Sequence, residues 1–334
     1  MNTDTTQDYL HLAKYAFHKE ITGGDQAFYK LLEFAKVYSH HENDTLSSML
    51  IELPFDVFWK QEIIKMAGVG YVASYPEARG NGAIRKLMTQ MLKDEYQKGT
   101  ALSYLAPFSY HFYEKFGYAY AFDRKYYQLK ATLFPQGNKG SGTVRRTSLD
   151  DSFEALEQIH HRAFNQGSIA RDREKWEYYF AYKSHPYFAI YEEKGKKTGY
   201  LIYEFEGQTF VIKELIALTT AAKEALYHFI SSHAGAFETI SWLAPINEKL
   251  EQEVKEPAAM TIEIKPYMMA RIVNLSEFLK VNGQPDFSVE IRDDLIPENN
   301  QVIGAGDAPT QKMTIGAFTA EMLRKNGSIL REYF

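Results

Sequence analysis

Residues 70–84 read GYVASYPEARGNGAI, a strand-like run that enters a glycine-bearing turn and then a helix. After the turn, apolar residues recur with helical spacing at positions 84, 87, 88, 91, 92 and 96. Such a turn directs main-chain N–H groups and the positive end of the helix dipole at one point. Gly80 and Gly82 let a bulky group approach the backbone, because a Cβ would obstruct it. The stretch therefore predicts a pyrophosphate cradle, with Arg79 adding positive charge at its rim.

Two other phosphate-binding turns fit this stretch less well. The phosphate loop of nucleoside triphosphatases requires Gly-Lys-Ser/Thr, which the stretch lacks. A dinucleotide fingerprint is present in outline as Gly68-x-Gly70-x-x-Ala73. The residues after Gly70 nevertheless read as a strand that runs into Pro76, where the dinucleotide-binding fold requires a helix.

Patterning on both sides of the turn predicts an α/β (α+β) fold. The first part shows expected helices at 8–17, 25–37, 84–98 and 110–115, and expected strands at 47–55, 62–75, 101–106 and 118–130. Residues 135–142 (PQGNKGSG) form the clearest linker. Beyond the linker the order repeats, with a helix at 150–164, strands at 187–191, 198–206 and 211–218, and a helix at 221–233. This repetition indicates an internal duplication, followed by strands at 269–273 and 287–291 and a helix at 314–325.

Composition excludes several classes of protein. The chain has 334 residues, enough for two or three domains, and no cysteine, which rules out disulfide scaffolds, zinc–thiolate sites and thiol nucleophiles. A net charge of −5 without a basic cluster argues against nucleic acid and anionic membrane as partners. The sequence contains no signal pattern and no apolar run of about 18 residues, so a cytoplasmic protein is expected. No metal is expected either, because the side chains of two adjacent histidines (40–41 and 160–161) point in different directions on a helix or a strand.

Two motifs together resemble a known superfamily. The run VASYPEARGNGAIRKLM (72–88) resembles the central motif of the GCN5-related N-acetyltransferases (GNAT), whose R/Q-x-x-G-x-G/A turn binds the pyrophosphate of coenzyme A. FYEKFGY (112–118) resembles the Tyr-x-x-x-Gly-Phe/Tyr ending of the same superfamily. Ile84 departs from the small residue that is usual in the turn. The departure suits the Eis-like (enhanced intracellular survival) subgroup, whose turns read R-x-x-G-x-x-R, and LSYLAPFSYHFYEKFGY (102–118) looks like the Gram-positive branch.

The resemblance implies an organisation in three domains. These would be a catalytic GNAT domain (1–134), a degenerate second GNAT-like domain (143–265) and a short C-terminal domain (266–334) similar to sterol carrier proteins. Residues 219–224 (TTAAKE) stand where a second Arg-x-x-Gly turn would be, so the second copy is expected to bind no cofactor. Members of the subgroup form symmetric homo-oligomers, often hexamers.

The resemblance also implies acetyl-CoA as cosubstrate and a set of residues that bind it. Main-chain groups of one strand would hold the pantetheine arm and polarise the thioester carbonyl, and the following turn would hold the pyrophosphate. The expected cofactor-binding residues are Val72, Ala73, Ser74, Arg79, Gly80, Asn81, Gly82, Ala83, Ile84 and Ser109.

Tyr113 stands where the superfamily places its general acid, and a phenol with an ordinary pKa of about 10 keeps its proton at neutral pH. The alternative is that Tyr113 is one of 24 tyrosines in an aromatic cluster. For the general base, residues 66–71 offer no acidic side chain, and Eis-like enzymes use the terminal carboxylate of a chain that ends in an aromatic residue. That carboxylate is expected on Phe334, although the aromatic end could instead serve packing alone, and Glu332 could attract a cationic substrate.

The expected function is acetyl transfer from acetyl-CoA to a primary amine of a small cationic acceptor, aminoglycoside- or polyamine-like, in a ternary complex. The sequence leaves two alternatives open. One is acetylation of protein lysines, and the other is an acyl-CoA-binding or sensing protein without turnover.

Overall fold

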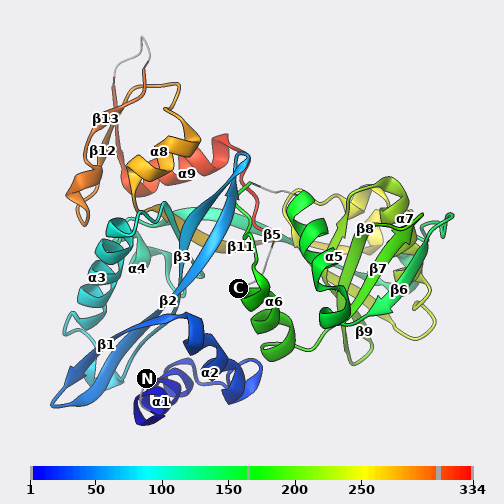
Figure 1. Ribbon diagram of the computed structural model, residues 1–334, viewed down its shortest axis with the longest axis horizontal. Helices are drawn as coiled ribbons and strands as arrows, with labels where there is room; N and C mark the ends of the chain where they lie inside the picture. Colours follow the sequence, from blue (N-terminus) through cyan, green and yellow to red (C-terminus); the bar gives the residue numbers. More distant parts are fainter. Residues whose placement is uncertain (1–2, 164–165, 306–309, 332–334) are drawn as a thin grey trace. The chain divides into compact units, whose positions relative to one another are not determined.

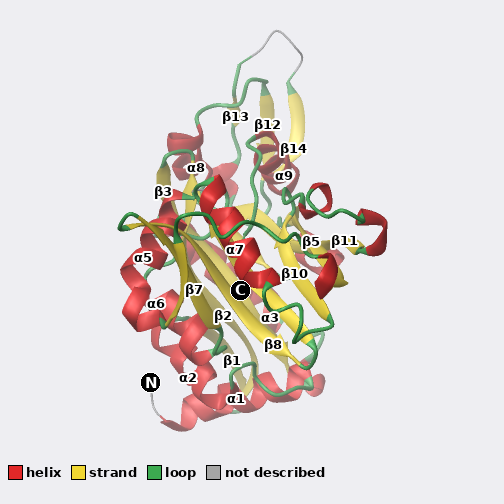
Figure 2. Ribbon diagram, turned by 90° about the vertical axis from the view of Figure 1, so that its right-hand side faces the viewer, coloured by secondary structure: helices red, strands yellow, loops and turns green. Residues whose placement is uncertain are grey.

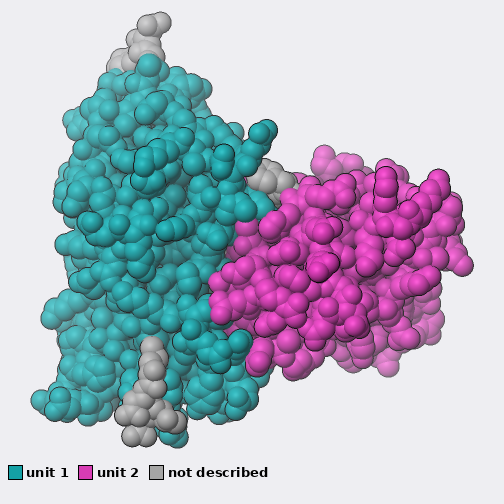
Figure 3. Space-filling view, viewed as in Figure 1, with its two compact units in different colours: residues 1–122, 267–328 teal, residues 123–266, 329–334 magenta. Residues whose placement is uncertain are grey.

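The computed structural model describes residues 3–163, 166–305 and 310–331. The chain divides into two compact units, one formed by residues 1–122 and 267–328 and the other by residues 123–266 and 329–334 (Figure 3). The chain passes from the first unit to the second within strand β5 (Ala119–Lys130) and returns within strand β11 (Thr261–Ile272). Residues 267–328 therefore share a unit with the N-terminal residues, and the expected three-domain division remains a prediction.

The first unit is built around a sheet whose successive strands are β1 (Lys36–Glu42), β2 (Thr45–Trp59), β3 (Glu62–Ser74), β4 (Leu102–Leu105) and β11 (Figure 1). Strands β1, β2 and β3 are antiparallel neighbours. Strand β4 runs parallel to β3 and antiparallel to β11. A parallel neighbour requires a crossover connection, which α3 (Ala83–Gln97) supplies between β3 and β4.

Helices of the first unit cover this sheet as their apolar spacing predicts. The face of α3 that carries Leu87, Met88, Met91 and Leu92 is buried in the core. The other helices here are α1 (Thr3–Phe17), α2 (Gly24–Phe34) and α4 (Tyr110–Glu114). The prediction that α2 continues to residue 37 is wrong. Ala35 adopts extended dihedral angles, and β1 begins at Lys36.

The C-terminal part of the first unit consists of α8 (Leu275–Asn282), α9 (Ile315–Lys325) and a small sheet. In that sheet β12 (Val289–Arg292) lies between β13 (Val302–Ile303) and β14 (Gln311–Thr314). Figure 2 shows the small sheet beside α8 and α9. Met269, Val273 and Ile296 from this part are buried in the same hydrophobic cluster as the core face of α3. The C-terminal part thus completes the core of the first unit.

The second unit contains a sheet in the order β5-β10-β9-β8-β7-β6. The strands are β6 (Thr143–Thr147), β7 (Tyr187–Glu193), β8 (Lys196–Glu206), β9 (Thr209–Ala217) and β10 (Thr239–Pro245). The helices are α5 (Leu149–Arg162), α6 (Arg173–Glu177), which continues into a π-helical turn (Tyr178–Tyr182), and α7 (Thr220–Ser231).

The predicted internal duplication is confirmed by the topology. In each unit an antiparallel run of strands leads to a parallel pair joined by a helix, β3-α3-β4 in the first and β9-α7-β10 in the second. The two copies differ where their crossover helices begin. Helix α3 begins after the glycine turn, whereas the side-chain oxygen of Thr219 caps α7 by accepting the N–H of Ala222 at 3.1 Å.

Candidate functional site

A pocket of about 730 Å³ opens in the first unit where β3 ends and α3 begins. Nine of the ten predicted cofactor-binding residues line it, namely Val72, Ala73, Ser74, Arg79, Gly80, Asn81, Gly82, Ala83 and Ile84. The tenth, Ser109, caps α4 instead, because its Oγ accepts the N–H of Phe112 at 3.3 Å. The predicted strand–turn–helix segment therefore forms one continuous wall of one pocket.

Both glycines of the turn have a left-handed backbone, with φ of 83° at Gly80 and 83° at Gly82. This conformation is unfavourable for residues that carry a Cβ. A Cβ built on either glycine would meet no protein atom within 4 Å. The space beside the turn is therefore open to a ligand, and the main chain is free of side chains that would keep a phosphate away.

The first turn of α3 offers hydrogen-bond donors to this space. The first N–H groups of a helix have no intrahelical partner. Asn81 Oδ1 accepts a hydrogen bond from the N–H of Ala83 at 2.9 Å. The first hydrogen bond of the helical pattern runs from the N–H of Lys86 to the carbonyl oxygen of Gly82, at 3.1 Å. The intervening residues, Ile84 and Arg85, both line the pocket. Their N–H groups belong to the first turn of the helix, where the helix dipole also favours an anion.

A β-bulge shapes the strand side of the pocket. Gly70 pairs with Ile51 and Ala73 with Met49, so Tyr71 and Val72 together oppose a single residue of β2. Tyr71 has a positive φ of 49°, a rare conformation for an aromatic residue. A bulge of this kind bends the strand and redirects its side chains, and here the pairing with β2 resumes at Ala73.

The pairing of β3 with the parallel strand β4 ends at Val69 and Leu105. Beyond that point the described residues show no further pairing between β3 and β4. Val72, Ala73 and Ser74, which line the pocket, belong to this part of the strand. The hydroxyl of Ser74 lies 2.8 Å from that of Ser48 on β2, which fixes the side chain at the strand end.

Four phenylalanines that we did not predict also line the pocket, and we call them the phenylalanine wall. They are Phe17 from α1, Phe108 from the loop before α4, and Phe112 and Phe116 around α4. Phe108 is 67% exposed and Phe17 is 39% exposed, so both rings present apolar surface to solvent. With 22 phenylalanines in the chain, residue type alone could not single these out.

The charges on the pocket lining are positive. Arg79, Arg85 and Lys115 line the pocket, and no acidic residue of the described chain is among its lining. Phosphate groups are bound by such cations together with main-chain N–H groups. Arg85 and Lys115 were missed as site residues, although Arg85 closes the R-x-x-G-x-x-R pattern.

Tyr113 packs against two rings of the phenylalanine wall and is not itself among the lining residues of the pocket. Its ring centroid is 5.2 Å from that of Phe108 and 5.1 Å from that of Phe112, and the side chain is buried. Burial, with a smaller contribution from the neighbouring Tyr118, raises the pKa of Tyr113 above its ordinary value. The phenol therefore holds its proton at neutral pH.

Phe334, the predicted source of the general base, lies outside the described residues. The residues just before the chain end are held within the second unit. The N–H of Ile329 donates to the carbonyl of Gln166 at 2.7 Å. The hydroxyl of Ser168 donates to the carbonyl of Ile329 at 2.8 Å and accepts the N–H of Arg331 at 3.0 Å.

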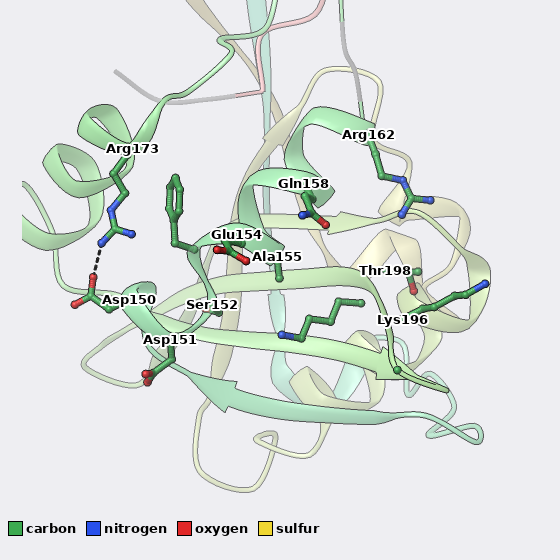
Figure 4. A pocket seen from close by; sticks show the side chains of 13 residues that line it. Asp150, Asp151, Ser152, Glu154, Ala155, Gln158, Arg162, Arg173, Lys196 and Thr198 are labelled. Atoms are coloured by element: carbon green, nitrogen blue, oxygen red, sulfur yellow. Dashed lines mark hydrogen bonds and ion pairs between the residues drawn. The ribbon is translucent and has the colours of Figure 1, made fainter.

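The second unit has a pocket of its own, about 760 Å³ in volume, between α5 and the turn that joins β7 to β8 (Figure 4). Arg173 lies beside Asp150 and pairs with it at 2.7 Å, while Arg162 and Lys196 lie at the other end of the pocket (Figure 4). Within the described part of the chain, its lining includes none of the predicted cofactor-binding or catalytic residues. The site geometry that we predicted is therefore confined to the first copy.

Among the described residues, no cluster of three or more His, Asp or Glu side chains is arranged to hold a metal ion. No helix in the same part of the chain has the length and apolar character needed to cross a bilayer.

Known families and structures match both copies. The model of a GNAT acetyltransferase domain matches residues 1–121, and that of a second GNAT acetyltransferase domain matches residues 167–272. A conserved protein of unknown function from Enterococcus faecalis V583, described as a "Probable N-Acyltransferase", is 31% identical, with a TM-score of 0.90 over 100% of this chain and 98% of that chain. No curated protein gives a significant match.

Two further crystal structures share the fold at lower identity. A GCN5-related N-acetyltransferase from Anabaena variabilis ATCC 29413 is 19% identical, with a TM-score of 0.83 over 98% of this chain and 92% of that chain. Eis1 from Mycobacterium abscessus is 18% identical, with a TM-score of 0.77 over 100% of this chain and 93% of that chain.

These matches confirm the expectation of an enzyme over that of a binding protein without turnover. The chain belongs to the GNAT acetyltransferases and is an acetyl-CoA-dependent N-acetyltransferase with two GNAT domains in tandem.

Proposed function

We propose that the protein transfers acetyl from acetyl-CoA to a primary amine of a small cationic acceptor, aminoglycoside- or polyamine-like, within a ternary complex. The observation that carries this proposal is the pocket at the end of β3. It combines an open glycine turn, three cationic side chains and the part of β3 that lies beyond its last pair with β4.

Acetyl-CoA supplies the acetyl group as a thioester. We assign its pyrophosphate to the turn formed by Arg79, Gly80, Asn81, Gly82, Ala83 and Ile84, because open space, N–H donors and positive charge meet there. We assign the pantetheine arm to Val72, Ala73 and Ser74, whose strand edge can hydrogen-bond an extended chain. Ser109 acts on this site indirectly, by capping the helix that carries Tyr113.

A cationic acceptor is favoured by the negative charge of the protein and by the acidic and aromatic residues near the end of β3. The chain carries a net charge of −5. The pKa of Tyr75, which follows Ser74, is raised chiefly by burial and then by the negative charges of Asp8 and Glu77. These two carboxylates therefore lie close enough to Tyr75 to act on it electrostatically. The ring of Tyr75 lies 5.3 Å from that of Tyr15, which is 49% exposed. Ammonium groups bind favourably to aromatic faces and to carboxylates.

Tyr113 serves as the general acid in this proposal. The reaction releases a thiolate, which must gain a proton, and the buried phenol of Tyr113 still has one to give at neutral pH. The carboxylate of Phe334 serves as the general base that removes the proton from the amine. Support for an ordered chain end comes from Ser168, which holds the preceding residues through Ile329 and Arg331.

The subgroup that fits these residues is the Eis-like one. Arg79 and Arg85, the two arginines of its R-x-x-G-x-x-R turn, both line the pocket. The likeness to Eis1 at 18% identity supports the fold alone. With this subgroup we propose a C-terminal segment similar to sterol carrier proteins, a symmetric homo-oligomer such as a hexamer, and a cytoplasmic location.

The test is release of free thiol from acetyl-CoA in the presence of kanamycin, spermidine or a lysine-containing peptide. Wild type is compared with a variant that carries one additional C-terminal glycine, which moves the carboxylate by up to ~3.6 Å without removing a side chain. Turnover with kanamycin or spermidine that collapses in the extended variant supports both the acceptor class and the base. Turnover with the peptide alone would replace the small acceptor by protein lysine, and equal rates in both forms would remove Phe334 from the reaction.

A further inference from the structure

A fully buried arginine of the C-terminal segment binds the turn that follows α4. Arg271 on β11 is 0% exposed. Its Nη1 donates to the main-chain oxygen of Phe116, and its Nε donates to the carbonyl of Ile272 at 3.2 Å. Its Nη2 forms an ion pair with Asp293. A buried charge is costly unless its donors are satisfied. Here the two terminal nitrogens of the guanidinium bind the carbonyl oxygen of Phe116 and the carboxylate of Asp293, respectively.

Asp293 is itself held rigidly by its surroundings. One carboxylate oxygen accepts the N–H groups of Leu295 and Ile296 at 3.0 and 3.1 Å. The other accepts the side-chain amide of Asn299 at 2.9 Å in addition to Arg271. A carboxylate with this many donors keeps one orientation, so Asp293 fixes the position of the Arg271 guanidinium.

The turn that Arg271 contacts is packed against the same segment from a second side. Gly117 has a φ of 76°, and a Cβ placed on it would lie 2.9 Å from Arg271 Nη1 and 2.9 Å from Ile315 Cγ2. A Cβ placed on Gly316, at the start of α9, would lie 2.9 Å from the carbonyl oxygen of Gly117. The turn thus lies between β11 and α9, both of which come from the C-terminal segment.

This turn and Tyr113 are joined through the main chain. The carbonyl of Tyr113 accepts the N–H of Phe116 at 2.9 Å and the N–H of Tyr118 at 3.3 Å. On the far side, the hydroxyl of Tyr118 lies 2.7 Å from that of Ser103 on β4. A displacement of the turn would therefore move the backbone that carries the phenol of Tyr113.

We propose that Arg271, oriented by Asp293, is a positioning residue for Tyr113. The guanidinium holds the carbonyl of Phe116 and through it the turn that sets the direction of the Tyr113 side chain. The inference rests on the proposed role of Tyr113 as general acid. It gives the C-terminal segment (residues 267–328) a part in the reaction. Residues of that segment hold the turn after α4, although none of its described residues lines the cofactor pocket.

The first arm of the test measures the turn itself, without any acceptor. Amide hydrogen exchange is compared for wild type, Arg271→Lys and Arg324→Gln. Lysine keeps the charge but lacks the fork that serves Asp293 and Phe116 together. Arg324→Gln is the matched control, since it removes an exposed ion pair with Glu321 on α9. We expect exchange at residues 116–118 to be at least ~10-fold faster in Arg271→Lys alone, with residues 80–85 unchanged.

The second arm is a double-mutant cycle between Arg271→Lys and Tyr113→Phe. Its readouts are kcat for thiol release, with whichever of kanamycin, spermidine or a lysine peptide is acetylated, and Kd for acetyl-CoA by calorimetry. If Arg271 acts through Tyr113, Arg271→Lys lowers kcat at least ~10-fold at unchanged Kd, and the double variant is no slower than Tyr113→Phe alone. If Arg271 had only a structural role, each substitution would lower kcat independently, and the two fold-losses would multiply in the double variant.

Each outcome decides the inference. Unchanged exchange at residues 116–118, or losses that multiply in the cycle, would overturn the positioning role while leaving Tyr113 as the acid. Full turnover by Tyr113→Phe would overturn the proposed role of Tyr113 as general acid, and this inference with it, while leaving acetyl transfer to the amine in place. If Arg271→Lys does not fold, Gly316→Ala replaces it, because the added methyl presses on the carbonyl of Gly117 without changing any charge.

Discussion

The side-chain oxygen of Asn81 lies 2.9 Å from the main-chain nitrogen of Ala83 and accepts its N–H. This bond closes the glycine turn over Gly82 and satisfies one of the first donors of α3. The donors that follow are left for a ligand, so the turn is organised for an anion before any anion is bound. Such preorganisation reduces the entropy that binding must overcome.

Gly82→Ala should weaken the binding of acetyl-CoA. The new methyl occupies the open space beside the turn, and alanine resists a φ of 83° at a cost of about 1–2 kcal/mol. We expect Kd for acetyl-CoA, measured by calorimetry, to rise by at least about tenfold, which corresponds to about 1.4 kcal/mol.

The matched control for this prediction is Gly207→Ala. Gly207 also has a positive φ, 57°, with no atom within 4 Å of a built Cβ, but it lies in the turn between β8 and β9. It should lower the stability by a similar amount and leave Kd unchanged. Equal Kd in wild type and Gly82→Ala would contradict the assignment of the pyrophosphate to this turn.

Removal of Glu214 should destabilise the second unit strongly. Glu214 Oε1 lies 2.6 Å from Arg171 Nη2, and both side chains are almost fully buried, at 6% and 2% exposure. Loss of one member of a buried ion pair leaves the other charge without compensation and costs about 3–5 kcal/mol. We expect Glu214→Ala to reduce the free energy of unfolding by that amount in urea denaturation.

Glu204→Ala provides the comparison on the same sheet. Glu204 pairs with Lys213 at 3.2 Å, but these side chains are 21% and 38% exposed. Solvent screens such a pair, and its loss should cost about 0–1 kcal/mol. If both variants lost the same free energy of unfolding, burial would not be the reason why the two ion pairs differ in strength.

Much of the lining of the candidate site could be predicted because it is local in sequence. Residues 72–84 carry the strand, the turn and the start of the helix, and each of these has a pattern that short-range physics explains. The phenylalanine wall could not be predicted in the same way. Phe17 and Phe116 meet at one pocket only after the chain between them has folded. Phe17 stands in no distinctive pattern, and the motif that contains Phe116 (112–118) directed attention to Tyr113 instead.

The same distinction explains the features of the fold that sequence reasoning missed. The residues of β1 read KVYSHHE, with neither an apolar alternation nor a turn before them, so the pattern extended α2 instead. Arg271 and Phe116 are 155 residues apart, and their contact depends on a strand from the C-terminal segment joining the first unit. Arrangements of this kind are set by long-range packing.

The stability of the protein should fall at alkaline pH. Burial raises the pKa of Tyr118 to about 12 and raises the pKa values of Tyr113 and Tyr200 well above the ordinary value. A raised pKa in the folded state means that stability is fully present below the unfolded pKa of about 10 and is lost as the pH rises above it. Each such tyrosine contributes a slope of up to about 1.4 kcal/mol per pH unit.

We therefore expect the urea midpoint, followed by circular dichroism, to stay level up to about pH 9 and to fall steeply above about pH 10. Tyr113→Phe should make that fall shallower, since one buried phenol no longer resists ionisation. A midpoint that stays level up to about pH 11 would show that these phenols are not shielded from water as the structure indicates.

Ser168→Ala should release the chain end. The hydroxyl of Ser168 bonds both Ile329 and Arg331, so the substitution removes two hydrogen bonds worth about 0.5–1.5 kcal/mol each. Leu330 between them is buried and would keep part of the attachment. We expect carboxypeptidase to digest the C-terminus several times faster in the variant, with Kd for acetyl-CoA unchanged.

The same variant tests whether an ordered terminal carboxylate is needed for acetyl transfer. If the carboxylate of Phe334 is the base, freeing the tail lowers kcat because the reactive position is held for a smaller fraction of the time. Ser184→Ala serves as the control, since the Ser184 hydroxyl donates at 2.8 Å to the carbonyl of Tyr179, a residue of the same unit outside the tail. Faster digestion with an unchanged kcat would separate the Ser168 contacts from catalysis and leave the base to be sought among side chains of the first unit.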